Sequence, residues 1–85
     1  MRTCFFLYFN EEAPARDASS VLDRRGFDVR VQSPDEHLRE WAVLALKDMS
    51  GRVTSLGFGL TERRLSRLAS RLGGEYDGHE VEIPR

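Results

Sequence analysis

The stretch Cys4-Phe5-Phe6-Leu7-Tyr8-Phe9 decides the fold that this sequence predicts. An uninterrupted apolar and aromatic run of this length, which stops at Asn10, is typical of a buried β-strand. Successive side chains of a strand alternate between its two faces, so the odd-numbered residues share one face and the even-numbered residues share the other. Both faces are apolar. We therefore expect a central strand that is covered on each side.

Length and composition bound the class of protein. The chain has 85 residues, which is enough for one domain. Hydrophobic residues at 40% and charged residues at 32% are typical of a globular protein rather than a disordered one. The formal net charge of -1 gives no overall attraction to nucleic acid or membrane. The single cysteine excludes an internal disulfide and a cysteine-based metal cluster, and it fits a cytoplasmic location.

The rest of the chain alternates helix and strand patterns. Apolar residues at helical spacing predict helices over residues 11–25 and 62–72, with Asn10 and Thr61 as their N-caps and glycines at their ends. The glycine-containing stretch Met49–Leu60 predicts a loop. Besides the first run, strands are predicted over residues 27–32, 41–46 and 75–83.

This order of elements defines the expected architecture. Strand, helix, strand, strand, helix, strand is the pattern of a ferredoxin-like α+β domain, with two helices on one face of a four-stranded antiparallel sheet. Val29 and Val31 identify the helix-covered face of the second strand. By periodicity, we expect the core to contain Phe5, Leu7, Phe9, Leu44 and Leu46. The open face then carries Phe6, Tyr8, Trp41 and Val43.

The last predicted strand carries a resemblance to a known family. Its residues Glu75-Tyr76-Asp77-Gly78-His79-Glu80 resemble the Glu-Tyr-Asp-Gly-Trp signature of the regulator of ribonuclease activity B family, which are inhibitors of endoribonuclease E. The order of the other elements agrees, and the resemblance spans roughly Thr3 to Ile83. His79 departs from the signature, and the better-known members also carry long acidic extensions. The resemblance implies a non-catalytic regulator that binds a protein target.

The sequence contains few residues that are suited to catalysis or metal binding. Cys4 lies in a predicted strand without a flanking cation, so we expect it to be packed rather than reactive. His37 lies in a polar connection, and His79 has acidic neighbours that a strand directs to opposite faces. Asp77 with Gly78 indicates a bulge or bend. No cluster shows metal-ligand spacing, so we expect no enzyme activity, no metal and no cofactor.

Nucleic acid is the main alternative to a protein partner. RNA-recognition domains share this topology and stack bases on aromatic residues of the two central strands, which the aromatic residues of the predicted open face could imitate. The third strand lacks the basic and aromatic motif of those domains. The second helix carries a stripe of three arginines, Arg64, Arg67 and Arg71. Such a stripe is either a solvated helix face or a surface that docks an acidic partner or phosphates.

The interpretation that follows is a regulatory protein-binding domain. An uncovered apolar face with aromatic residues marks a protein interface unless part of the chain, such as the Met49–Leu60 loop, covers it. The expected partner is a protein such as an endoribonuclease, or a second copy in a homodimer, and RNA is disfavoured. The alternative is an RNA- or small-ligand-binding domain that uses the open sheet face. The expected partner-binding residues are Phe6, Tyr8, Trp41, Val43, Tyr76, Asp77, Arg64, Arg67 and Arg71.

Overall fold

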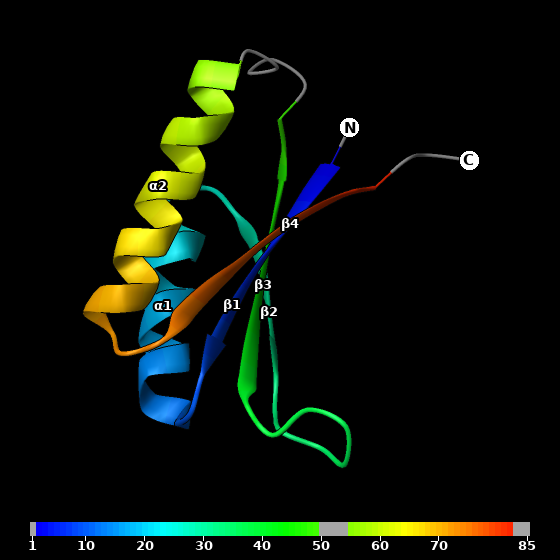
Figure 1. The fold of residues 1–85 in the computed structure, drawn as a ribbon, viewed down its shortest axis with the longest axis vertical. Helices are drawn as coiled ribbons and strands as arrows, with labels where there is room; N and C mark the ends of the chain where they lie inside the picture. Colours follow the sequence, from blue (N-terminus) through cyan, green and yellow to red (C-terminus); the bar gives the residue numbers. More distant parts are fainter. Residues whose placement is uncertain (1, 50–54, 83–85) are drawn as a thin grey trace.

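The fold has two layers, a four-stranded sheet and a pair of helices that lie on one of its faces (Figure 1). The computed structural model describes residues 2–49 and 55–82. Its elements are β1 (Arg2–Phe9), α1 (Glu12–Arg24), β2 (Asp28–Gln32), β3 (Trp41–Asp48), α2 (Ser55–Arg71) and β4 (Glu75–Glu82). The sheet order is β2-β3-β1-β4, with every neighbouring pair antiparallel. This confirms the predicted ferredoxin-like α+β fold.

Helix α1 ends as the sequence predicted but begins slightly differently. Gly26 follows the helix with a φ of 90°, a conformation that favours glycine, and its N–H donates to the Asp23 carbonyl at 3.1 Å. The predicted N-cap Asn10 is wrong, because the cap position is Glu11, whose side chain makes no capping hydrogen bond. The helix is held mainly by its buried apolar stripe, which consists of Ala15, Ala18 and Leu22.

Helix α2 begins at Ser55, seven residues before the predicted start at residue 62. Gly57 and Gly59 lie inside the helix, and Thr61 is not an N-cap but donates its hydroxyl to the Gly57 carbonyl at 3.2 Å. Each glycine costs a helix roughly 1 kcal/mol relative to alanine. The ring of Phe58 packs 5.6 Å from that of Phe5 in the core, so tertiary burial outweighs this cost. Residues 50–54 of the predicted loop, and Ile83 of the predicted last strand, lie outside the described residues.

The register of the two central strands corrects the predicted face of β3. Phe5 pairs with Ala45 and Leu7 with Val43, and residues paired across an antiparallel ladder lie on the same face. Ala45 and Val43 are fully buried in the core, whereas Leu44 belongs to the opposite face. The prediction that Leu44 and Leu46 lie on the helix-covered face is therefore wrong; Leu46 is buried, but on the opposite face. A run that is apolar at every position carries no alternation from which its face can be read.

A bulge in β4 confirms the expected role of the Asp77-Gly78 pair. Phe5 pairs with His79 and Leu7 with Tyr76, so β4 has one residue more than β1 between these two pairs. Gly78 takes up the irregularity with a φ of 100°. The consequence is that Tyr76 and His79 both face the helices.

The two helices cover different halves of the same sheet face. Helix α1 contacts mainly β2 and β3, and α2 contacts mainly β4 and β1. Neither of the helices formed by the described residues lies over the opposite face (Figure 1). Two surfaces are therefore candidates for partner binding: the helix side of the domain and the uncovered face of the sheet.

Candidate partner-binding surfaces

The uncovered face of the sheet carries an apolar strip along its two central strands. Cys4 pairs with Leu46, Phe6 with Leu44, and Tyr8 with Ala42, so all six side chains share this face. Cys4, Leu46 and Ala42 are buried, and the other three are half-buried. None of the six belongs to the core cluster beneath the helices. We call Cys4, Phe6, Tyr8, Ala42, Leu44 and Leu46 the apolar strip. It is a second apolar layer, and neither α1 nor α2 lies over it.

Carboxylates flank the apolar strip on one side. In β4, Glu75 pairs with Tyr8, Glu80 with Cys4 and Glu82 with Arg2, which places these side chains on the uncovered face. Asp77 lies near enough to raise the pKa of Tyr8, second only to burial in its effect. We call Glu75, Asp77, Glu80 and Glu82 the acidic edge.

The other side of the apolar strip, toward β2, carries charges of both signs, and the Cys4 thiol within the strip has low reactivity. Arg2 pairs with Asp28 of β2 at 2.8 Å across the sheet. Burial raises the pKa of Cys4, and the charges of Glu82 and Glu80 raise it further. Because the thiolate is the reactive form, Cys4 is a packing residue at neutral pH rather than a nucleophile.

Two of the residues predicted for the open face lie on the helix-covered face instead. Val43 is fully buried among the core residues. Trp41 packs against the same core, and the guanidinium carbon of Arg16 from α1 lies 5.8 Å from the centre of its ring. The placement of Trp41 and Val43 on the open face is therefore wrong. Phe6, Tyr8 and Asp77 do share that face.

Tyr76 takes part in a polar cluster on the helix side that the sequence did not indicate. Glu62 of α2 accepts a hydrogen bond from the Tyr76 hydroxyl, and the same carboxylate oxygen lies 3.0 Å from Nδ1 of His79. Phe58 packs against the His79 ring with 4.5 Å between centroids. Glu62 is 14 and 17 residues from its partners, so no local pattern announces the cluster. It ties α2 to β4.

The pKa shifts in this cluster point to structure rather than catalysis. Burial by itself would raise the pKa of Glu62, but the hydrogen bonds from Tyr76 and His79 outweigh it and lower that pKa. Burial, followed by the hydrogen bond to Glu62, raises the pKa of Tyr76 far above its ordinary value. The phenol therefore remains a protonated donor at neutral pH, and Glu62 remains an ionised acceptor. Neither group is tuned for proton transfer near neutral pH.

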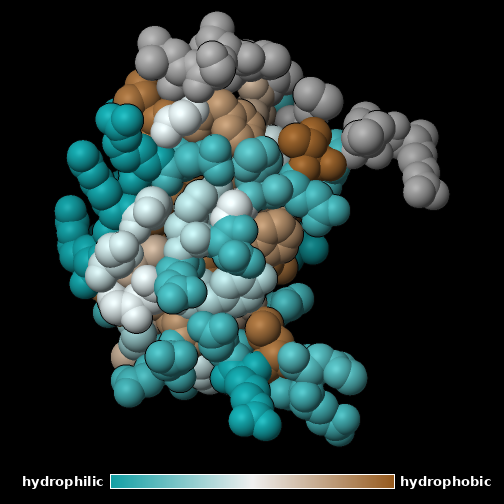
Figure 2. Space-filling view, viewed as in Figure 1, coloured by the Kyte–Doolittle hydropathy of each residue, from teal (hydrophilic) through white to brown (hydrophobic). Residues whose placement is uncertain are grey.

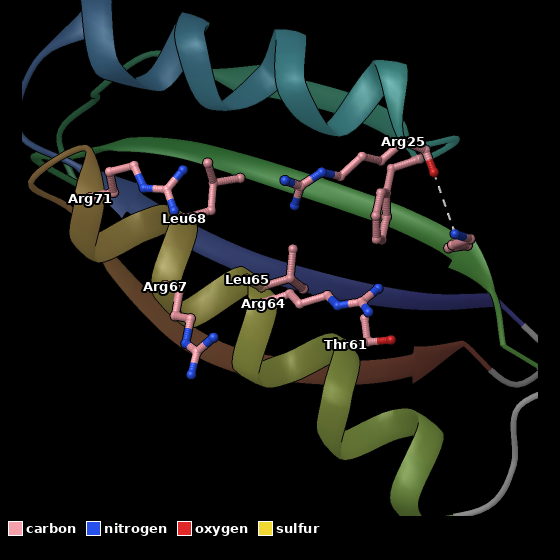
Figure 3. Close-up of a pocket in the computed structure, with 9 residues that line it drawn as sticks. Arg25, Thr61, Arg64, Leu65, Arg67, Leu68 and Arg71 are labelled. Atoms are coloured by element: carbon pink, nitrogen blue, oxygen red, sulfur yellow. Dashed lines mark hydrogen bonds between the residues drawn. The ribbon is translucent and has the colours of Figure 1, made fainter.

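The predicted arginine stripe forms one wall of a groove between the helices (Figure 3). The groove has a volume of about 560 Å³. The structure adds Arg25, at the end of α1, and Lys47, on β3, to Arg64, Arg67 and Arg71. We call this feature the basic groove; it is lined by Arg25, Phe27, Lys47, Thr61, Arg64, Leu65, Arg67, Leu68 and Arg71.

The cations of the basic groove differ in how they point. Arg25 and Arg64 extend into the space between α1 and α2, whereas Arg67 projects outward from α2 (Figure 3). Lys47 donates to the Arg25 carbonyl at 3.5 Å, and its ammonium lies 4.8 Å from the centre of the Phe27 ring. Long hydrophilic side chains also project along the outer edge of α2 (Figure 2). Sequence periodicity found the stripe on one helix but had no means to find its partners on other elements.

Within residues 2–49 and 55–82, no group of three or more His, Cys, Asp and Glu side chains is arranged to hold a metal ion. No helix in the described part of the chain is long and apolar enough to cross a membrane.

Together, the topology and the two surfaces define a small ferredoxin-like α+β domain with an apolar sheet face and a basic groove. The family model for the regulator of ribonuclease activity B matches residues 1–81. The chain therefore belongs to the regulator of ribonuclease activity B family, and the resemblance carried by the Glu75–Glu80 stretch is confirmed. The family is one of regulators rather than enzymes. No curated protein and no solved structure matches the chain.

Proposed function

We propose that this protein regulates an endoribonuclease by binding the enzyme, or the scaffold that carries it, through the apolar strip. The observation that carries the proposal is the apolar second face of β1 and β3, over which neither α1 nor α2 lies. Family membership supports a regulatory role, and the cytoplasm, where ribonucleases meet RNA, is the proposed location. Tyr8 is a suitable anchor because tyrosine buries a large area and keeps a polar hydroxyl for a partner.

Charge favours a protein partner over RNA on this surface. The acidic edge lies directly beside the apolar strip and would repel a phosphate backbone. The same carboxylates would attract a protein segment that combines apolar residues with lysine or arginine. A second copy of the chain would bring another acidic edge, which makes a homodimer through this face less favourable than a basic partner.

The test uses purified endoribonuclease E and its cleavage of a short labelled RNA. The wild-type protein should inhibit cleavage in proportion to complex formation. Phe6→Ala combined with Tyr8→Ala should weaken binding by more than about 30-fold, since hot-spot truncations cost ~2 kcal/mol or more. Leu60→Ala is the control, because Leu60 is an exposed apolar residue on α2, away from this face.

Three outcomes would contradict the proposal. The first is the absence of both inhibition and binding by the wild-type protein. The second is an unchanged affinity in the double variant while its unfolding midpoint stays close to wild type. The third is sedimentation showing that the double variant loses only self-association or only RNA binding, which would assign the face to a homodimer or to the alternative nucleic-acid function.

A further inference from the structure

The basic groove gathers five cations in a chain whose formal net charge is -1. Among the described residues, no acidic side chain lines it. The ion pairs among the described residues join Arg2 to Asp28, Arg16 to Glu12, and His79 to Glu62. None of these pairs involves a cation of the groove. Like charges that gather around one groove without a described counter-charge favour an anionic ligand.

Charged side chains form the walls of the groove, and apolar side chains form its floor. Phe27, Leu65 and Leu68 lie at its base, each less than 10% exposed. A phosphate backbone would use the walls but gain little from such a floor. A peptide that alternates acidic and apolar side chains would use both, because alternate residues of an extended chain point in opposite directions.

The aromatic residue in the groove is not available to stack with a base. The Lys47 ammonium sits 4.8 Å from the centre of the Phe27 ring, and Phe5 packs against Phe27 edge-on with 6.1 Å between centroids. Proteins that bind single-stranded nucleic acid combine a basic groove with aromatic faces that remain open to bases. The second half of that arrangement is missing among the residues that line this groove.

The size of the groove fits a short segment. From Thr61 to Arg71 the helix rises about 15 Å, at about 1.5 Å per residue. An extended peptide covers the same length with four to five residues, at roughly 3.3 Å each. Arginine is suited to such a ligand because its planar guanidinium can hold a carboxylate through two parallel hydrogen bonds.

We propose that the basic groove binds a short, extended acidic segment of a partner protein, with its carboxylates on the arginines and its apolar side chains on the floor. This site lies on the helix side of the sheet, opposite the apolar strip. It is therefore a second binding surface, independent of the one through which we propose ribonuclease regulation. A protein with both surfaces can hold two segments of opposite charge at the same time.

The experiment measures binding of a fluorescently labelled peptide of about eight residues in which glutamate and leucine alternate. The control peptide replaces glutamate by glutamine. The protein variants are Arg25→Ala and Arg64→Ala, and the matched controls are their neighbours, Arg24→Ala and Arg63→Ala. The control arginines are exposed and lie on the same two helices or their ends, but they do not line the groove.

We expect the glutamate peptide to bind and the glutamine peptide to bind at least about tenfold more weakly. Arg25→Ala and Arg64→Ala should each weaken the glutamate peptide by about fivefold to tenfold, since each removes a charge-assisted contact. Arg24→Ala and Arg63→Ala should change the affinity by less than about twofold, because exposed charges outside the groove act only weakly.

Several results would overturn the proposal. One is the absence of saturable peptide binding, and another is an equal loss in groove and control variants, which would indicate diffuse charge attraction. A single-stranded oligonucleotide that binds more tightly than the peptide, with a salt slope that Arg67→Ala lowers by about one ion, would assign the groove to RNA. Self-association that Arg64→Ala abolishes would assign it to the acidic edge of a second copy.

Discussion

Strand β1 has two apolar faces that differ in how deeply they are buried. Phe5 and Phe6 are neighbours with identical side chains, yet Phe5 is completely buried and Phe6 is only half-buried. The difference arises because both helices of the described part of the chain, α1 and α2, lie over the odd-numbered face of β1. Hydrophobicity made both faces able to enter a core. The placement of the helices decided which one did.

The two sides of the sheet also differ in charge. The helix side carries the five cations of the basic groove, and the uncovered side carries the four carboxylates of the acidic edge. A formal net charge of -1 hides this separation. Electrostatic attraction therefore favours a basic ligand on the uncovered side and an acidic ligand on the helix side, although the net charge indicates neither.

The sharpest test of the comparison is to truncate the two neighbouring phenylalanines. Phe5→Ala should lower the free energy of unfolding by about 3–5 kcal/mol, because Phe5 contacts Phe27 and Phe58 inside the core. Phe6→Ala should cost only about 1 kcal/mol, because its side chain is already partly exposed. Urea denaturation measures both values. If Phe5→Ala leaves no folded protein, Phe5→Leu keeps the comparison measurable, and equal losses for the two positions would refute it.

A second pair of variants tests how α2 seals the covered face. Leu68→Ala should cost about 2–5 kcal/mol, because Leu68 is 6% exposed and its loss leaves a cavity in a small core. Leu60→Ala, at a residue that is 43% exposed, should change stability by less than about 0.5 kcal/mol. A loss below ~1 kcal/mol at Leu68 would mean that the register of α2 on the sheet is wrong.

The cluster of Glu62, Tyr76 and His79 should make the free energy of unfolding depend on pH, because the carboxyl group of Glu62 must be ionised to accept its hydrogen bonds. Its folded-state pKa is lowered from the ordinary 4.5, so its stabilising contribution is complete above pH 4.5 and is lost as the pH falls through the folded-state value. Glu62→Gln should therefore lower stability by about 1 kcal/mol at neutral pH. The difference from wild type should shrink in more acidic solution. Denaturation curves at several pH values measure it, and a pH-independent difference would show that ionisation of Glu62 is not its source.

The smallest expected effect concerns the beginning of α2. A Cβ added at Gly59 would meet no atom within 4 Å, and the residue has no positive φ. Gly59→Ala should therefore stabilise the protein by about 0.5–1 kcal/mol, through the lower entropy of the unfolded chain. Thermal unfolding measures the gain. A loss of stability would indicate that this turn is not helical in solution.

Much of the fold was predictable because local patterns carry it. The alternation of Val29 and Val31, the leucines of α2 and the glycine that ends α1 all act over a few residues, and each predicts its element correctly. The wrong predictions concern segments in which the sequence pattern is uninformative or in which tertiary packing outweighs local preference. The apolar run of β3 has no alternation, so its face was assigned to the wrong side. Gly57 and Gly59 favour a loop locally, but burial of Phe58 draws them into a helix.

The sites divide in the same way. Phe6 and Tyr8 were placed together correctly because one strand sets their alternation, and the arginine stripe was found because one helix sets its spacing. Trp41 was misplaced because its face depends on the register between two strands. Glu62, Arg25 and Lys47 carry no local signal of their roles, because those roles depend on contacts between elements that are distant in the chain.

The sequence by itself determined the order of elements, the family and the existence of a strand that is apolar on both faces. These follow from short-range periodicity and from a local signature. Only the tertiary structure decided which face of that strand the helices cover, which face of β3 joins it, and which cations and carboxylates gather on each side. Those outcomes depend on strand register and helix placement, since a shift of one residue in a strand moves every side chain to the other face.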